Sequence, residues 1–144
     1  MPKTQPNLFQ KIIQGEIPAH RIYEDEHVLV ILDARPLSRG HCLVIPKEAA
    51  ETLDELSDDA SAAIGRVLPR ICQALIKATG TRDYNILQNN GALAHQAISQ
   101  VHFHVIPKPS RSEGLGIDWP AYELEDGQAL CDSIRGHLRP QAAA

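Results

Sequence analysis

The pattern of apolar and polar positions predicts one long helix among several short strands. Ser57 is a favourable helix N-cap before an acidic first turn, and Gly80 ends the pattern. Pro69 lies inside this segment and is expected to kink it. The apolar residues at helical spacing are Ile64, Val67, Leu68, Ile71 and Leu75. Runs of β-forming residues between turn signals predict strands over 21–24, 28–32, 41–45, 84–88 and 101–106. Shorter helices are predicted over 8–14 and 124–138.

The order of these elements predicts the fold class. Predicted strands follow one another without an intervening helix over most of the chain, which favours an antiparallel sheet in an α+β fold over a βαβ alternation. About five strands are expected around the long helix and a short N-terminal helix. The sequence has no Gly-rich turn between a strand and a helix, so a P-loop or a dinucleotide-binding fingerprint is absent. With 144 residues, the chain is expected to form a single domain over 1–144.

Composition and charge indicate a globular protein and argue against some classes of binding partner. Hydrophobic residues make up 43% of the chain, enough for a core. The 14 Lys and Arg residues against 18 Asp and Glu give a net charge of −4, which argues against docking on nucleic acid or an anionic membrane. The longest apolar run, 28–32, is too short to span a membrane, and no signal peptide is evident, so we expect a soluble, cytoplasmic protein. The isolated Cys42, Cys72 and Cys131 are expected to be reduced and mostly buried thiols.

Candidate chemistry is concentrated in one histidine-rich segment. His95, His102 and His104 fall within ten residues. Because side chains alternate along a strand, His102 and His104 should share an exposed face with Gln100, while Val101, Phe103 and Val105 face the core. The preceding loop, 88–96, is polar and offers amide donors for the oxygens of a phosphate. These residues alone leave nucleophilic or acid–base chemistry and metal binding about equally favoured, with a surface histidine pair as the lesser alternative.

Three separated segments together resemble the histidine-triad (HIT) superfamily of nucleotide hydrolases and transferases. The segment Gln96-x-x-x-Gln100-Val101-His102-Phe103-His104-Val105-Ile106-Pro107 resembles the family signature. The stretch 9–18 is similar to the N-terminal helix and turn of the family, and Asp33, Pro36, Gly40, His41 and 43–47 are similar to its central segment. The closest likeness is to the Hint branch, the purine nucleoside phosphoramidases. The resemblance implies a HIT-like fold with a core over about 8–107 and a C-terminal extension over 108–144.

The resemblance also implies roles for individual residues. His102 matches the nucleophile that attacks the α-phosphorus and forms a nucleotidyl-histidine intermediate, His104 matches the histidine that contacts the phosphate, and His41 matches a histidine behind the nucleophile. Asp33 matches the acid that holds the ribose hydroxyls. The expected nucleotide-binding residues also include an apolar base slot and the residues around it, namely Phe9, Ile12, Ile17, Ile31, Ala34, Asn89, His95, Gln96 and Ala97. The implied activity is that of an adenosine 5′-monophosphoramidase-like hydrolase acting on a purine nucleoside phosphoramidate or a related adenylated substrate.

The sequence departs from the family pattern at a few positions. Gln100 stands in place of the first histidine of the triad, and Ala97 stands where a hydroxyl or carboxylate side chain is common. These two changes keep open a second function, a catalytically weak module that binds purine nucleotides, because Gln cannot titrate. Zinc-binding members carry Cys where this chain has Asn7 and Gln10, so no metal and no other cofactor is expected. The leaving group and the choice between adenine and guanine stay open.

Two further expectations concern assembly and the phosphate loop. The resemblance implies a homodimer in which the long helix and a sheet edge pair across a two-fold axis. It also places the C-terminal segment near the pocket of the partner, so that Trp119 either lines that pocket or packs the tail. His95 stands where many members have Gly. Its imidazole either turns to solvent or enters the phosphate pocket as a donor.

Overall fold

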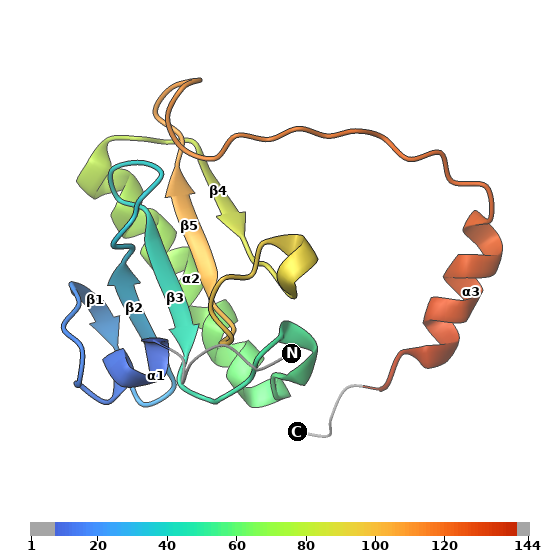
Figure 1. Ribbon diagram of the computed structural model, residues 1–144, viewed down its shortest axis with the longest axis horizontal. Coiled ribbons are helices and arrows are strands. Elements are labelled where there is room, and N and C mark those ends of the chain that lie inside the picture. The colour runs from blue at the N-terminus through green and yellow to red at the C-terminus, as the bar shows by residue number, and fades with distance from the viewer. Residues whose placement is uncertain (1–7, 141–144) are drawn as a thin grey trace.

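The computed structural model describes residues 8–140 and contains a five-stranded antiparallel sheet (Figure 1). The spatial order of the strands is β1-β2-β3-β5-β4, so that β1 and β4 form the two edges. The predicted α+β class and the number of strands are confirmed. The strands are β1 (Arg21–Glu24), β2 (Val28–Leu32), β3 (Cys42–Pro46), β4 (Tyr84–Leu87) and β5 (Phe103–Pro107).

The helix α2 (Asp58–Thr79) covers one face of the sheet. Its N-terminus is capped by the Ser57 hydroxyl, which accepts a hydrogen bond from the backbone of Ala60, and Gly80 closes it in the left-handed conformation at φ 72°. The helix continues through Pro69, whose side chain is exposed. The apolar stripe predicted from the sequence packs against strand residues in a core made of Val28, Val30, Cys42, Val44, Ala63, Ile64, Val67, Ile71, Cys72 and Val105.

The helix α1 (Leu8–Ile13) lies over the opposite face of the sheet. Phe9 and Ile12 are its buried residues, and they pack against the alternate positions of the same two central strands, namely Leu29, Ile31, Leu43 and Ile45. Because both faces of β2 and β3 are covered, these strands are apolar at nearly every position instead of alternating between apolar and polar residues. The layer between α1 and the sheet is the one in which the candidate site lies.

Several predicted element boundaries shift in the structure. The strand predicted over 101–106 runs instead from Phe103 to Pro107, because Val101 donates its backbone hydrogen bond to the carbonyl of Ala50 outside the sheet. The strand predicted over 41–45 runs from Cys42 to Pro46, and Pro46 and Pro107 are the last residues of their strands. Two single turns of 3-10 helix, Leu53–Glu55 and Ala92–Ala94, lie in the connections.

Residues 108–140, here called the C-terminal arm, leave the body after β5 and end in α3 (Gly127–His137) (Figure 1). The helix α3 has no buried residue and stands apart from the sheet. The arm is tied to the body at both ends. The Gly114 backbone N–H donates to the Leu37 carbonyl at 3.1 Å, and Arg139 forms an ion pair with Asp58 at 2.7 Å. Within residues 8–140, no helix is both long and apolar enough to cross a membrane.

Candidate active site

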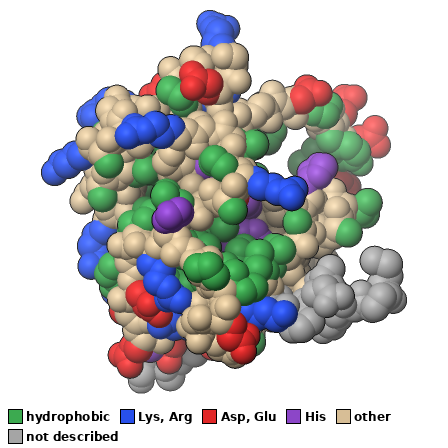
Figure 2. Space-filling model, turned by 60° about the vertical axis from the view of Figure 1, so that its left-hand side comes forward, with side chains coloured by type: hydrophobic (Ala, Val, Ile, Leu, Met, Phe, Trp, Pro, Cys, Tyr) green, Lys and Arg blue, Asp and Glu red, His purple; other side chains and the backbone are tan. Residues whose placement is uncertain are grey.

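A cavity of about 930 Å³ lies between α1, the sheet and the loop that follows β4. Its walls combine an apolar part with an imidazole-rich part, and Figure 2 shows histidine side chains among hydrophobic ones on this side of the molecule. The predicted residues that line it are Phe9, Ile12, Ile17, Ile31, Asp33, Ala34, His41, Asn89, His95, Ala97, His102 and His104. The predicted residues Gln96 and Gln100 do not line it.

His102 is held in one orientation by the backbone two residues before it. Its Nδ1 atom lies 2.7 Å from the carbonyl oxygen of Gln100, which can only accept a hydrogen bond. The neutral ring therefore carries its proton on Nδ1 and its lone pair on Nε2. The ring packs edge-on against Phe9 of α1, with 4.8 Å between the ring centroids. Burial lowers the pKa of His102 from the ordinary value of 6.5, so the imidazole is neutral at pH 7.

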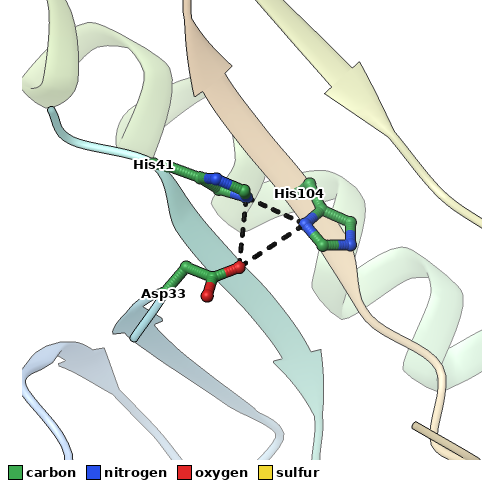
Figure 3. Close-up of side chains that lie close together, drawn as sticks. All are labelled: Asp33, His41 and His104. Carbon is green, nitrogen blue, oxygen red and sulfur yellow. Dashed lines mark hydrogen bonds and ion pairs between the residues drawn. The ribbon is translucent and has the colours of Figure 1, made fainter. Parts of the chain in front are cut away.

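His41 and His104 form a second, connected pair (Figure 3). The Nδ1 atom of His41 accepts a hydrogen bond from the backbone N–H of Leu37 at 3.0 Å, so the ring proton of neutral His41 must be on Nε2. That Nε2–H lies 2.9 Å from His104 Nδ1 and 3.3 Å from Asp33 Oδ2. When His104 accepts this hydrogen bond, its own proton is on Nε2, at the opposite edge of its ring.

Burial and crowding keep both of these histidines uncharged. Desolvation lowers the pKa of His41, against the attraction of Asp33. The pKa of His104 falls to about 4, first because of desolvation and then because His102 and His41 repel a second positive charge. The site at pH 7 therefore holds three neutral imidazoles beside one carboxylate. His102 presents a lone pair, and His104 presents an N–H when it accepts from His41.

Asp33, His41 and His104 also raise the question of a metal ion, because their ligand-type atoms lie within 4.8 Å of one another. A metal at this position would need the lone pair of His41 Nε2. With Nε2 bound to the metal, the proton of the neutral ring would have to be on Nδ1. It would then face the backbone N–H of Leu37, whose nitrogen lies 3.0 Å from Nδ1. Two N–H donors cannot face each other at that distance, so these residues do not fit a metal ion.

Gln100 occupies a different environment from the one expected. The sequence predicted that Gln100, His102 and His104 lie on an exposed face of a strand, and this prediction is wrong, because Gln100 is 0% and His102 only 6% exposed. The Gln100 side-chain amide donates to the carbonyls of Pro46 and Glu48 and accepts from the Gln10 side chain. The residue at the first triad position thus joins α1 to the end of β3.

The polar loop after β4 is shaped by the Gln96 side chain. Its Oε1 atom accepts from the Gly91 backbone at 2.7 Å, and its Nε2 atom donates to the carbonyls of Glu51 and Ile98. With its amide engaged in this way, Gln96 fixes the loop while Asn89, His95 and Ala97 line the cavity. His95 is exposed and adopts the left-handed conformation at φ 67°, which favours glycine.

Some lining residues were not predicted from the sequence. They include Ala19, His20, Arg35, Leu37, Leu87 and Ile98. Leu87 could have been found by alternation, since it pairs with His104 across β4 and β5 and so shares its face. The Leu37 backbone N–H carries no sequence signal, because any residue except Pro would supply it.

The chain is similar in sequence and in structure to known proteins, some of which are named for an enzymatic activity. Residues 14–111 match the HIT domain family. The chain is 45% identical over 134 residues to adenosine 5′-monophosphoramidase hnt1 of Schizosaccharomyces pombe, covering 92% of this chain and 98% of that protein. It is 47% identical over 136 residues to adenylylsulfatase HINT3 of Arabidopsis thaliana, covering 91% of this chain and 68% of that protein. A crystal structure of a HIT family protein from Bacillus anthracis is similar with a TM-score of 0.89 at 33% identity, covering 94% of this chain and 99% of that one.

Proposed function

The chain belongs to the HIT domain family, and on that premise we propose that it is a nucleotide hydrolase that works through a nucleotidyl-histidine intermediate on His102. The observation that carries the proposal is the state of His102: a neutral ring in the cavity, held at Nδ1 by the Gln100 carbonyl, with its lone pair on Nε2. A neutral imidazole is a nucleophile at pH 7, and it leaves phosphorus readily once the bond is made.

The proposed reaction has two displacements. In the first, the His102 Nε2 lone pair forms a bond to the α-phosphorus while the bond from phosphorus to the leaving group breaks, and the leaving group takes up one proton from solvent as it departs. The Gln100 carbonyl stabilises the positive ring that results. In the second, a water oxygen attacks the phosphorus and releases one proton to solvent, the P–Nε2 bond breaks with its electron pair returning to Nε2, and a nucleoside monophosphate is released with His102 neutral again. His104, 5.0 Å away between ring centroids, is placed to donate from Nε2 to a phosphate oxygen.

The rest of the cavity fits the nucleoside half of such a substrate. Phe9, Ile12, Ile17 and Ile31 form an apolar slot for a purine base, and Asp33 is placed beside the histidines to accept hydrogen bonds from ribose hydroxyls. The named relatives act on adenosine 5′-phosphoramidates and adenylyl sulfate, two substrates with a common adenosine 5′-phosphoryl group. The proposed substrate is therefore a purine nucleoside phosphoramidate or a related adenylated compound. A panel of adenosine and guanosine 5′-phosphoramidates, with nucleoside monophosphate release as the readout, tests it.

The alternative function is a purine nucleotide-binding module with little catalysis. Ala97 favours it, because it brings only a methyl group to the cavity. Gln100 does not favour it, because the amide at this position lies outside the cavity lining and holds backbone carbonyls. Tight binding of AMP together with no product from adenosine 5′-phosphoramidate would support the module and contradict the hydrolase.

We also propose a homodimer in a reducing, cytoplasmic environment. The C-terminal arm exposes large apolar side chains, namely Ile117, Trp119, Tyr122, Leu124, Leu130, Ile134 and Leu138. An isolated helix of 11 residues such as α3 is marginal in water, so these side chains call for a partner surface, and a second copy supplies one beside the open edge of β4. Sedimentation should give about twice the 15.8 kDa chain mass, and a 15.8 kDa species at micromolar concentration would contradict the dimer. The free thiols of Cys42, Cys72 and Cys131 fit a reducing compartment.

A further inference from the structure

Asp33 stands between the part of the cavity proposed for the sugar and the histidine pair. Its Oδ1 atom accepts a hydrogen bond from the Arg35 backbone at 2.8 Å, which fixes the carboxylate after β2. Its Oδ2 atom faces the histidines, 3.3 Å from His41 Nε2 and 3.9 Å from His104 Nδ1 (Figure 3). The carboxylate lines the cavity and is partly exposed to it.

The single proton of His41 Nε2 therefore has two competing acceptors. It cannot move to Nδ1, because Leu37 N–H occupies that side of the ring. If it points to His104 Nδ1, His104 must hold its own proton on Nε2. If it points to the charged Oδ2 of Asp33, His104 Nδ1 is released, and the His104 proton can occupy either nitrogen by exchange with solvent. The direction of one hydrogen bond thus decides whether His104 presents a donor or a lone pair at Nε2.

We propose that sugar hydroxyls bound to Asp33 set the tautomer of His104, so that recognition of the ribose switches on the phosphate donor. Two vicinal hydroxyls donating to the carboxylate use its lone pairs and weaken it as an acceptor for His41. The His41 Nε2–H then donates to His104 Nδ1 alone, and His104 keeps its proton on Nε2. This inference rests on the proposed function for the identity of the ligand. It makes Asp33 a positioning residue as well as a binding residue.

Replacement of Asp33 by Asn makes the proposal testable with nearly unchanged shape. The Arg35 N–H requires an oxygen, so the amide oxygen of the variant should remain at Oδ1 and its NH₂ group should face His41. Because an NH₂ group cannot accept from His41 Nε2–H, Asp33→Asn should fix His104 in the Nε2–H form whether or not a sugar is bound.

The first measurement is histidine ring ¹⁵N NMR of the full-length protein, with the His104 signals assigned from His104→Gln. Adenosine should increase the Nε2–H form of His104 in the wild type, and 2′,3′-dideoxyadenosine should leave it as in the free protein. In Asp33→Asn, His104 should be in the Nε2–H form with both ligands, as it is in the wild type with adenosine bound. Equal His104 tautomers with the two ligands in the wild type would overturn the proposal. These nucleosides carry no phosphate, so the result is independent of any hydrolysis.

The second measurement is turnover at saturation with adenosine 5′-phosphoramidate and its 2′,3′-dideoxy analogue. In the wild type, kcat should be about tenfold lower with the dideoxy substrate, the scale of one hydrogen bond. In Asp33→Asn the two kcat values should be equal. Asp25→Asn is the matched control, because Asp25 accepts backbone hydrogen bonds in the turn before β2 and lies outside the cavity lining, and it should keep the wild-type ratio. A difference confined to KM would overturn the coupling, whereas hydrolysis of neither substrate would contradict the proposed function instead.

Discussion

The backbone carbonyl of Gln100 accepts a hydrogen bond from His102 Nδ1 at 2.7 Å, while the side chain of Gln100 bonds to the carbonyls of Pro46 and Glu48. One residue therefore has two separable tasks. Its backbone sets the tautomer of the proposed nucleophile, and its side chain ties that backbone to the end of β3. The first task survives any substitution that leaves the backbone in place, whereas the second depends on the amide.

Removal of the amide should destabilise the fold. Gln100→Ala leaves two carbonyls without their donor in a buried position, and each such loss costs about 1–3 kcal/mol, so we expect the free energy of unfolding to fall by about 2–6 kcal/mol. Urea unfolding measures this change. Gln128→Ala, at an exposed position of α3, is the control and should shift the free energy by no more than about 0.5 kcal/mol. Equal stability of Gln100→Ala and wild type would contradict the structural task.

Restoration of a histidine at the same position separates the two candidate functions. If Gln100 acts through its backbone and its buried amide, Gln100→His should change kcat by no more than about tenfold. A missing acid–base group would instead be restored, with a gain of about 10²–10⁴-fold. Single-turnover kinetics with adenosine 5′-phosphoramidate distinguish the outcomes, with AMP affinity measured in parallel. A gain above a hundredfold would favour the weak binding module as the description of the natural chain.

The neutral histidines predict a loss of stability in mild acid. Folding lowers the pKa of His104 from 6.5 to about 4 and lowers those of His41 and His102, so between these values the unfolded chain binds more protons than the folded one. Stability must then rise with pH through this window and level off above about pH 6.5. Carboxylates such as Glu24 titrate below their ordinary value of 4.5, so the range above pH 5 reports mainly the histidines.

Thermal unfolding between pH 5 and 7 measures this effect, with the pH bounds set around the reference imidazole pKa of about 6.5. His104→Asn should flatten the slope, because one of the groups that take up protons on unfolding is gone. A transition temperature that is constant over this range, or that rises on acidification, would contradict the assignment of neutral imidazoles.

A side chain at Gly40, directly before His41, should destabilise the protein. The Gly40 φ of +97° disfavours a Cβ, and a Cβ built there would lie 2.8 Å from Thr79 Cγ2 and 2.9 Å from Leu75 Cδ1 of α2. We expect Gly40→Ala to lower the free energy of unfolding by about 2–4 kcal/mol through strain and overpacking. Gly65→Ala is the matched control, because that glycine lies inside α2 with open space at its Cβ. The control should raise stability by up to about 1 kcal/mol. Equal effects of the two substitutions would contradict the close approach at Gly40.

The central strands and α2 were predictable because the local preferences of their residues favour the same elements that packing in the folded protein stabilises. The apolar runs of β2 and β3 have the composition of strands buried on both sides, and Ser57 and Gly80 mark the ends of α2. The shared face of His102 and His104 followed from alternation. Its burial did not, because the cover comes from Phe9, more than ninety positions earlier in the chain. Periodicity within one segment carries no information about which distant segment packs on it.

The hydrogen bonds that define the histidine tautomers were not predictable either. The resemblance supplied His41 and Asp33 as candidates, but their contact depends on the antiparallel pairing in which Leu32 lies opposite Cys42. The tautomer of His41 is fixed by the backbone N–H of Leu37, which donates to Nδ1. The conformation of the loop after β4 is fixed by hydrogen bonds of the Gln96 side-chain amide. A backbone N–H has no signature in the amino-acid sequence, so these contacts are seen only in the folded structure.

Replacement of the proposed nucleophile should abolish turnover and spare binding. His102→Ala removes Nε2 but leaves the apolar slot and Asp33 in place, so AMP affinity should change by less than about tenfold while product release stops. Calorimetric titration with AMP and an assay of AMP release check the two halves of this prediction. His27→Ala, at an exposed histidine in the turn before β2, is the control and should retain full turnover.

Trapping of the nucleotidyl-histidine intermediate is the decisive experiment for the proposed mechanism. The wild-type protein is mixed with adenosine 5′-phosphoramidate, quenched within one turnover in base to preserve a P–N bond, digested, and mapped by mass spectrometry. We expect one adenylyl group on the peptide that contains His102, on a time course that precedes AMP release, and no such group in His102→Ala. AMP release by His102→Ala at the wild-type rate, or an adenylyl group carried by another residue, would contradict this mechanism.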